Sequence, residues 1–194
     1  MKIHPYKYLL IFFCWVMMVC ISCNSNTTTK ILLPPDVRIF NYDTLLKQNT
    51  EGWFYKGQPF NGYMVQEEKN HRIVYELPIL NGKENGWAKG CYYNGAKLLE
   101  RYYSDGKKEG LYKQWWPNGH YRYLFNYKNG IYEGTQIVYF ANGSKRQESN
   151  YENGEEEGIQ RTWNEQSILI SNYTIKNKIQ YGIIKIKSCI PATH

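Results

Sequence analysis

Hydrophobic and polar positions from residue 52 onwards fall into short runs separated by turn signals. The runs are six to eight residues long and rich in Tyr, Trp, Phe, Val and Ile. Runs of this length and composition favour strands over helices. Asn-Gly or Asp-Gly pairs stand between them, and these pairs tolerate the positive φ that tight hairpin turns require. The pattern predicts two antiparallel strands per unit, joined into one meander.

The unit recurs at a constant step of 24 residues. Three glycine series keep this step without an insertion: Gly62, Gly86, Gly110, Gly134, Gly158 and Gly182; Gly95, Gly119 and Gly143; Gly82, Gly106, Gly130 and Gly154. Two aromatic series follow them: Tyr103, Tyr127 and Tyr151; Trp115, Tyr139 and Trp163. Such phasing is typical of a repeat protein. We therefore expect an all-β fold, an elongated single-layer antiparallel meander of 24-residue β-hairpin repeats with about eleven or twelve strands.

The register follows from the turn after Trp116. Pro117 suits the first position of a type I turn, and Gly119 suits a left-handed position after it. This three-residue loop pairs residue 115 with 121, and it places odd positions of both strands on one face. A two-residue loop would scatter the aromatic residues over both faces, because one residue of slip inverts a strand. We prefer the three-residue register.

Residues 1–22 are expected to be a signal peptide. Lys2 and Lys7 form a basic start, and the apolar run that follows is shorter than the roughly 20 residues that span a bilayer. The run closes on Ser22-Cys23, which resembles the lipobox of bacterial lipoproteins, although Cys20 stands where that motif usually has Leu. The resemblance implies cleavage before Cys23 and lipid attachment to it. An ordinary signal peptide or an uncleaved anchor is the alternative.

Residues 23–51 are expected to form a polar tether and an N-terminal cap, with one helical turn over residues 44–48. The repeat array is expected over residues 52–190, with five units from Gly62 and partial units at both ends. Cys91 and Cys189 lie four repeats apart, too far for a disulfide in this architecture. Cys91 occupies the repeat position of Trp115 and is interpreted as a buried small residue.

Charge changes this picture little. The chain has 24 basic and 17 acidic residues, a formal net charge of +7. Only two basic residues and no acidic one precede residue 23, so the mature chain carries +5. These charges are spread over all repeats without a Lys/Arg block, which argues against nucleic-acid binding.

The glycine and aromatic pattern resembles a known repeat. Residues 55–62, Tyr-Lys-Gly-Gln-Pro-Phe-Asn-Gly, followed by Glu-Gly, Trp, Asn-Gly and Tyr at constant step, look like the variant MORN (membrane occupation and recognition nexus) repeat of bacterial proteins. The resemblance covers about residues 52–187. It implies a twisted antiparallel sheet that serves as a scaffold. Several bacterial members of the family are labelled antitoxin components of toxin–antitoxin systems, and many others are unassigned lipoproteins.

No set of residues predicts catalysis. His71 and His120 lie two repeats apart, roughly 19 Å by strand spacing, too far to share a metal or a nucleophile. Glu100 and Glu148 are equally separated and are interpreted as charges on a solvated face. Glu109, Glu133 and Glu157 precede repeat glycines and are interpreted as loop residues, with an acidic rim as the alternative. We expect no enzyme activity, no catalytic residue, no metal and no cofactor.

The surface is therefore the candidate functional feature. The candidate binding surface is an aromatic strip on one face: Trp115, Tyr139, Trp163, Tyr121 and Tyr127. Packing against side chains of neighbouring strands is the simplest role of this strip, and binding of a partner is the functional alternative. The chain is expected to be a non-catalytic scaffold for protein–protein interaction, lipid-anchored to a membrane of the bacterial cell envelope on its periplasmic or surface side. The alternatives are an antitoxin or immunity protein that neutralises a cognate toxin, and a glycan-binding module.

Overall fold

The computed structural model describes residues 34–68 and 71–183, and these contain strands and turns but no helix. The expected signal peptide and lipid attachment at Cys23 lie outside the described residues. Within them, no helix is long and apolar enough to cross a membrane. The strands are β1 (Arg38–Phe40), β2 (Leu46–Asn49), β3 (Gly52–Tyr55), β4 (Gln58–Pro59), β5 (Gly62–Glu67), β6 (Ile73–Leu80), β7 (Lys83–Glu84), β8 (Gly86–Cys91), β9 (Lys97–Ser104), β10 (Lys107–Trp115), β11 (Tyr121–Lys128), β12 (Ile131–Tyr132), β13 (Gly134–Tyr139), β14 (Lys145–Glu152), β15 (Glu155–Trp163), β16 (Leu169–Lys176) and β17 (Ile179–Ile183).

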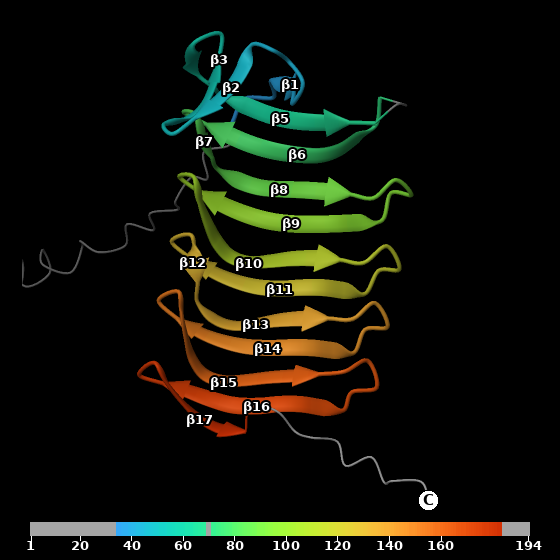
Figure 1. The fold of residues 1–194 in the computed structure, drawn as a ribbon. Helices are drawn as coiled ribbons and strands as arrows, with labels where there is room; N and C mark the ends of the chain where they lie inside the picture. Colours follow the sequence, from blue (N-terminus) through green and yellow to red (C-terminus); the bar gives the residue numbers. More distant parts are fainter. Residues whose placement is uncertain (1–33, 69–70, 184–194) are drawn as a thin grey trace, which may run out of the picture. The chain divides into compact units, whose positions relative to one another are not determined.

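Fourteen of these strands form one sheet, in which β5 to β17 follow one another in chain order (Figure 1). Strands β7 and β12 are short side branches that pair with β6 and β11. All neighbours are antiparallel except β1, which runs parallel to β5 and covers its outer edge. The remaining strands, β2 to β4, make a small separate sheet. The prediction of an all-β protein built on a large, mostly antiparallel sheet is confirmed.

Two kinds of turn alternate along the sheet. At one end the Trp116 N–H donates to the His120 carbonyl (2.8 Å) and the Gly119 N–H donates to the Trp116 carbonyl (2.9 Å), which closes the three-residue loop. At the other end Asn129 and Gly130 both have positive φ, 52° and 89°, as a two-residue hairpin turn requires. The sequence Asn-Gly meets this need because both residues tolerate left-handed backbone.

The expected register is wrong beyond Tyr121. Trp115 does pair with Tyr121, but Gln114 pairs with Tyr123, so Arg122 has no opposite residue in β10. This extra residue is a β-bulge, and it inverts the facing of the rest of β11. Trp115 and Tyr127 consequently lie on opposite faces of the sheet. The same shift recurs one and two repeats later, before Tyr139 and before Trp163.

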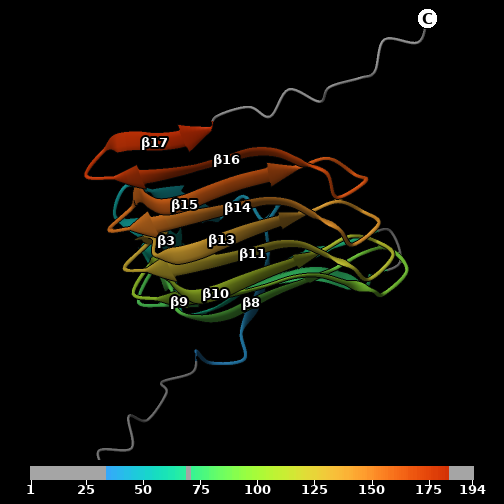
Figure 2. The same ribbon diagram turned by 90° about the horizontal axis from the view of Figure 1, so that it is seen from below.

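We call the two surfaces the Trp115 face and the Tyr127 face. The Trp115 face carries Trp115, Tyr121, Tyr139 and Trp163, together with Glu100, Lys113 and Glu148. The Tyr127 face carries Tyr103, Tyr112, Tyr123, Phe125, Tyr127 and Tyr151. Among the described residues no second layer covers β8 to β17 on either face (Figure 2).

The apolar core lies where the small sheet meets the large one. It consists of Leu46, Phe60, Met64, Leu77, Ile79 and Ala88. Leu46 is 8% exposed and begins β2, so the expected helical turn over residues 44–48 is wrong. Burial of this leucine in an extended strand outweighs the weak capping signal at Asp43. The Asp43 side chain instead accepts the Leu45 N–H within a turn (2.8 Å).

Further along the sheet, buried amides replace apolar side chains. Gln136 occupies the repeat position of Ala88, and its Oε1 accepts the Asn126 N–H (2.8 Å) while its Nε2 donates to the Asn126 carbonyl (3.1 Å). Gln160 is 2% exposed at the same position one repeat on, and its Nε2 donates to the Asn150 carbonyl (2.9 Å). These amides satisfy backbone groups that the irregular pairing at the start of each repeat leaves open.

Candidate functional site

Four of the five candidate residues form one row on the Trp115 face, beside the three-residue loops. The Trp115 and Tyr121 ring centroids are 5.5 Å apart, and those of Tyr121 and Tyr139 are 6.4 Å apart. Trp163 continues the row on β15 at the repeat position of Tyr139. Tyr127 does not belong to it, because the bulge at Arg122 places Tyr127 on the opposite face. We call the four residues the aromatic row.

Lysines and glutamates flank the aromatic row. The Lys97 Nζ lies 5.3 Å from the centre of the Trp115 ring, and the Lys145 Nζ lies 5.8 Å from that of Trp163. Each lysine also pairs with a glutamate three residues on, at 2.8 Å to Glu100 and 2.5 Å to Glu148. The sequence interpretation placed both glutamates on the other face from the tryptophans. The bulges correct this, since they bring rings, ammonium groups and carboxylates together.

The members of the row differ in what they offer to a partner. Trp115 is 8% exposed, so neighbouring side chains cover most of its ring and its role is largely cross-strand packing. Tyr121 is 40% exposed and presents its ring to solvent. A row of this kind has a buried anchor in the sheet and an exposed aromatic beside it. Aromatic residues in such positions dominate the energetics of protein interfaces.

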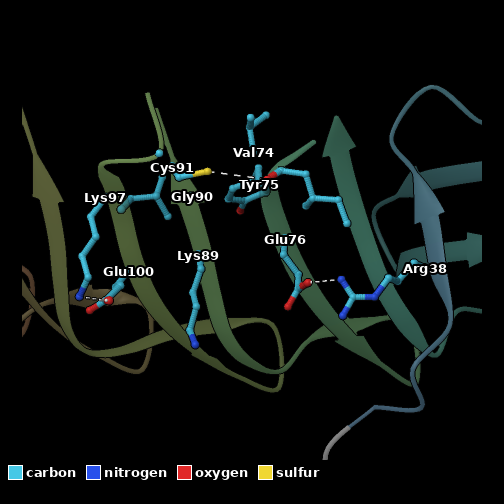
Figure 3. Close-up of a pocket in the computed structure, with 12 residues that line it drawn as sticks. Arg38, Val74, Tyr75, Glu76, Lys89, Gly90, Cys91, Lys97 and Glu100 are labelled. Carbon is cyan, nitrogen blue, oxygen red and sulfur yellow. Dashed lines mark hydrogen bonds and ion pairs between the residues drawn. The ribbon is translucent and has the colours of Figure 1, made fainter. Parts of the chain in front are cut away.

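A shallow groove of about 520 Å³ adjoins the row at its Lys97 end (Figure 3). Glu76, Lys89 and Glu100 lie opposite one another on successive strands, so charges alternate along its floor. Arg38 closes the far side through an ion pair with Glu76 (2.6 Å). The sequence analysis missed this groove because the alternation becomes visible only when the register of three strands is known.

Cys91 lines the same groove. It occupies the repeat position of Trp115, as expected, but the residue is only half-buried, so the interpretation as a buried small residue is wrong. The Cys91 Sγ donates to the Ile73 carbonyl (3.7 Å). The Arg72 guanidinium approaches the sulfur and donates to the Tyr92 carbonyl. A small side chain here leaves open the space that an indole fills at Trp115.

On the Tyr127 face, tyrosines form a second cluster at the two-residue turns. The Tyr132 ring lies 4.9 Å from the Tyr127 ring and 5.1 Å from the Tyr151 ring. Burial raises the pKa of Tyr103 to about 12, and it also raises the pKa of Tyr127. These phenols therefore remain neutral throughout the physiological range. The three rings form a patch of neutral phenols beside the two-residue turns of this face.

The glutamates that precede repeat glycines have a defined structural role. The Asn129, Asn153 and Asn177 N–H groups donate to the Glu109, Glu133 and Glu157 carboxylates at 2.8, 2.9 and 3.1 Å. Asn61 does the same for the Asn81 N–H through its side-chain oxygen (2.7 Å). Each acceptor thus holds the hairpin turn of the following repeat.

The titratable side chains that could support chemistry have separate structural partners. The His71 Nδ1 lies 3.2 Å from the Glu67 carboxylate, and the His120 Nδ1 lies 3.0 Å from the Ala141 carbonyl. Within the described ranges, no three His, Cys, Asp or Glu side chains are grouped as metal ligands would be. Comparisons with family models, with curated proteins and with solved structures find no match to this chain.

Proposed function

We propose that this chain is a non-catalytic scaffold of the bacterial cell envelope that binds a protein partner through the aromatic row and the adjoining groove. The observation that carries the proposal is the row itself. The rings of Trp115, Tyr121 and Tyr139 follow one another, with Trp163 at the next repeat position, on a face that no second layer covers among the described residues. Apolar surface in such a position usually has a binding role.

The repeat class is part of the proposal. Strands β9, β11, β14 and β16 begin at Lys97, Tyr121, Lys145 and Leu169, a step of 24 residues each time. The loops after Tyr92, Trp116 and Phe140 have the same closing hydrogen bonds. These regularities support an array of MORN-type β-hairpin repeats, in which function resides on the faces and the turns maintain the geometry.

A photoreactive phenylalanine analogue tests the protein partner. It replaces Tyr121 on the row, or Tyr93, an exposed loop residue, as the control. Irradiated cells should yield one discrete protein adduct at position 121 and none at position 93. The adduct should weaken when Trp163→Ala is added, because the Trp163 ring belongs to the same row. Absence of any protein adduct at position 121 would sink the proposal.

Membrane attachment is proposed through acylation of Cys23 after removal of residues 1–22. Its support is the short apolar run that ends at Ser22-Cys23. Cys23→Ala should abolish lipid labelling and release the chain from the membrane fraction. Unchanged processing and membrane retention of this variant would show that the chain is exported or anchored in another way. A toxin as the partner is a special case, and a toxin gene next to this one would favour it.

One observation favours the glycan alternative. The Glu100 and Glu148 carboxylates stand beside the rings of the row through their lysine pairs. Rings that cover apolar sugar faces, with charged groups that bind hydroxyls, are a workable carbohydrate site. Binding to a glycan panel that is lost in Tyr121→Ala, without a protein adduct at position 121, would select this alternative.

A further inference from the structure

The Tyr127 face contains two arginines that are held between aromatic rings. The Arg101 guanidinium carbon lies 5.3 Å from the centre of the Tyr103 ring and 5.0 Å from that of Tyr112. The Arg122 guanidinium carbon lies 4.5 Å from the Trp116 ring and 5.0 Å from the Tyr123 ring. Stacking of this kind fixes the plane of each guanidinium and leaves its N–H edge free to bind.

The Nε–H group of each guanidinium has no acceptor among the described residues. The Nε atoms of both Arg101 and Arg122 are buried, and neither has a hydrogen-bond partner there. A buried donor without an acceptor costs free energy, so an unpaired one calls for an explanation. Two of them on one face, in equivalent aromatic surroundings, indicate a ligand rather than a local packing defect.

Carboxylates are also missing around these two arginines, although the described chain pairs other arginines with them. Arg38 pairs with Glu76 (2.6 Å) and Arg161 with Glu148 (3.4 Å) on the Trp115 face, whereas none of the ion pairs among the described residues includes Arg101 or Arg122. Lys108 adds positive charge nearby, with its Nζ 4.8 Å from the Tyr127 ring. Arg101, Arg122 and Lys108 therefore bring positive charge to the Tyr127 face without a direct ion pair among the described residues, although Glu84 also acts on Tyr103.

The charges of both arginines act on the same side chain, Tyr112. Burial raises the pKa of Tyr112, and the charges of both Arg101 and Arg122 act to lower it. Both guanidinium groups therefore lie near the same phenol. The Tyr112 hydroxyl donates to the Gln114 Oε1 (2.7 Å), which fixes its orientation. A neutral phenol flanked by two positive groups is a suitable centre for an anionic side chain.

We propose that the Tyr127 face binds an acidic polypeptide segment, whose carboxylates pair with the N–H edges of Arg101 and Arg122. A carboxylate fits the guanidinium fork with two parallel hydrogen bonds. The rings of Tyr103, Tyr112 and Tyr123 would contact the rest of the segment. Tyrosine and arginine are the residues enriched in protein interfaces, which favours a polypeptide over other anions. Arg146 repeats the Arg122 position one unit on, with its guanidinium 5.8 Å from the Phe140 ring, and would extend the contact.

This inference shares with the proposed function only the class of partner, a polypeptide, and it uses the opposite face. Its test measures binding of fluorescent poly-L-glutamate to the full-length chain in non-ionic detergent, at an ionic strength of about 0.15 M, where exposed charges are screened beyond about 8 Å. The variant R101Q/R122Q should weaken binding by about tenfold or more, because both forks are lost. The control K113Q/R161Q removes the same charge from the Trp115 face, away from the groove, and should change binding less than about threefold.

Two further measurements keep the proposal falsifiable if the first variant unfolds. R101K/R122K keeps the charge but removes the planar fork, and it should still weaken binding by about fivefold. Dextran sulfate has no polypeptide backbone or carboxylates, so its binding should fall less than that of poly-L-glutamate in both arginine variants. Equal losses in the arginine variants and in the control, equal sensitivity of dextran sulfate, or no binding of poly-L-glutamate would each overturn the proposal. The adduct at position 121 tests the proposed function on the Trp115 face, so its outcome is independent of the outcome of this test.

Discussion

Glu133 gives the sharpest test of how one repeat holds the next. Its carboxylate accepts the N–H of Asn153, the first left-handed residue of the following turn, at 2.9 Å. Glu133→Ala removes the acceptor, and water must then replace it. Glu133→Gln keeps an oxygen in the same place and removes only the charge. Asn61 shows that an amide oxygen suffices, because it accepts the Asn81 N–H at 2.7 Å.

The size of the effect follows from the exposure of the contact. A hydrogen bond to a charged group contributes about 1.5–3 kcal/mol when buried. This one is solvent-exposed, so a contribution of about 1 kcal/mol is expected after competition from water. Glu133→Ala should therefore lower Tm by about 2–4 °C in a folded region of this size. Glu133→Gln should lower Tm by less than half as much, since the acceptor remains.

Thermal unfolding followed by circular dichroism decides between these outcomes. Glu152→Ala is the matched control, because Glu152 is exposed in the same repeat and its side chain has no hydrogen bond among the described residues. Its free energy of unfolding should change by no more than about 0.5 kcal/mol, as is usual for surface substitutions. Its Tm should therefore shift by less than about 2 °C. The reasoning fails if Glu133→Ala melts with the parent, or if Glu133→Gln is as harmful as Glu133→Ala.

Three other substitutions test the turns and the tyrosines. Gly119 has φ 88°, and no neighbouring atom lies within 4 Å of the place that a Cβ would take. Gly119→Val should therefore lower the free energy of unfolding by about 1–3 kcal/mol through backbone strain alone, and an unchanged Tm would contradict this. Lys178 has φ 64° at a position where the preceding repeats have glycine. Lys178→Gly should therefore stabilise the β16–β17 hairpin by about 0.5–1 kcal/mol, even after loss of the exposed ion pair between Lys178 and Glu155. The gain should be measured as slower amide exchange in this hairpin. Burial raises the pKa of Tyr103 to about 12 in the folded chain, whereas the unfolded value is near 10. The stabilising contribution of the neutral phenol is therefore complete below pH 10 and is lost as the pH rises towards 12. Tyr103→Phe should reduce this alkaline loss of stability, and an unchanged alkaline melting profile would contradict the assignment.

The sheet could be predicted from the sequence because its turns are encoded locally. Asn129-Gly130 must adopt left-handed backbone, and Pro117-Asn118-Gly119 fits one loop type. Both signals act within a few residues, so they do not depend on packing. The N-terminal segment lacks such signals, and there the prediction of a helical turn failed. Its strand β2 is decided by burial of Leu46 against residues far along the chain.

The candidate surface was only partly predictable, and the reason is a single residue. The step of 24 residues places Trp115, Tyr139 and Trp163 in line whatever the register, so the aromatic row survives. The assignment of Tyr127 to that row required strict alternation along β11, and the bulge at Arg122 breaks it. A bulge adds one residue without a turn signature, so no pattern of glycines reveals it.

The bulge also changes what each face can bind. Strict alternation would have placed Tyr127 with Trp115 on one face, and Arg122 with Glu100 and Glu148 on the other. The shift instead places Lys97 and Glu100 beside Trp115, and Arg101 beside Tyr103 and Tyr112. Each face then combines rings with fixed charges, and such a surface can select a partner by charge as well as by apolar area. Deleting Arg122 would leave Tyr121 opposite Trp115 and Tyr123 opposite Gln114 in regular alternation. The contact between Trp115 and Tyr121 and that between Tyr112 and Phe125 should therefore both be kept, and loss of either would contradict the assignment of Arg122 as the bulge.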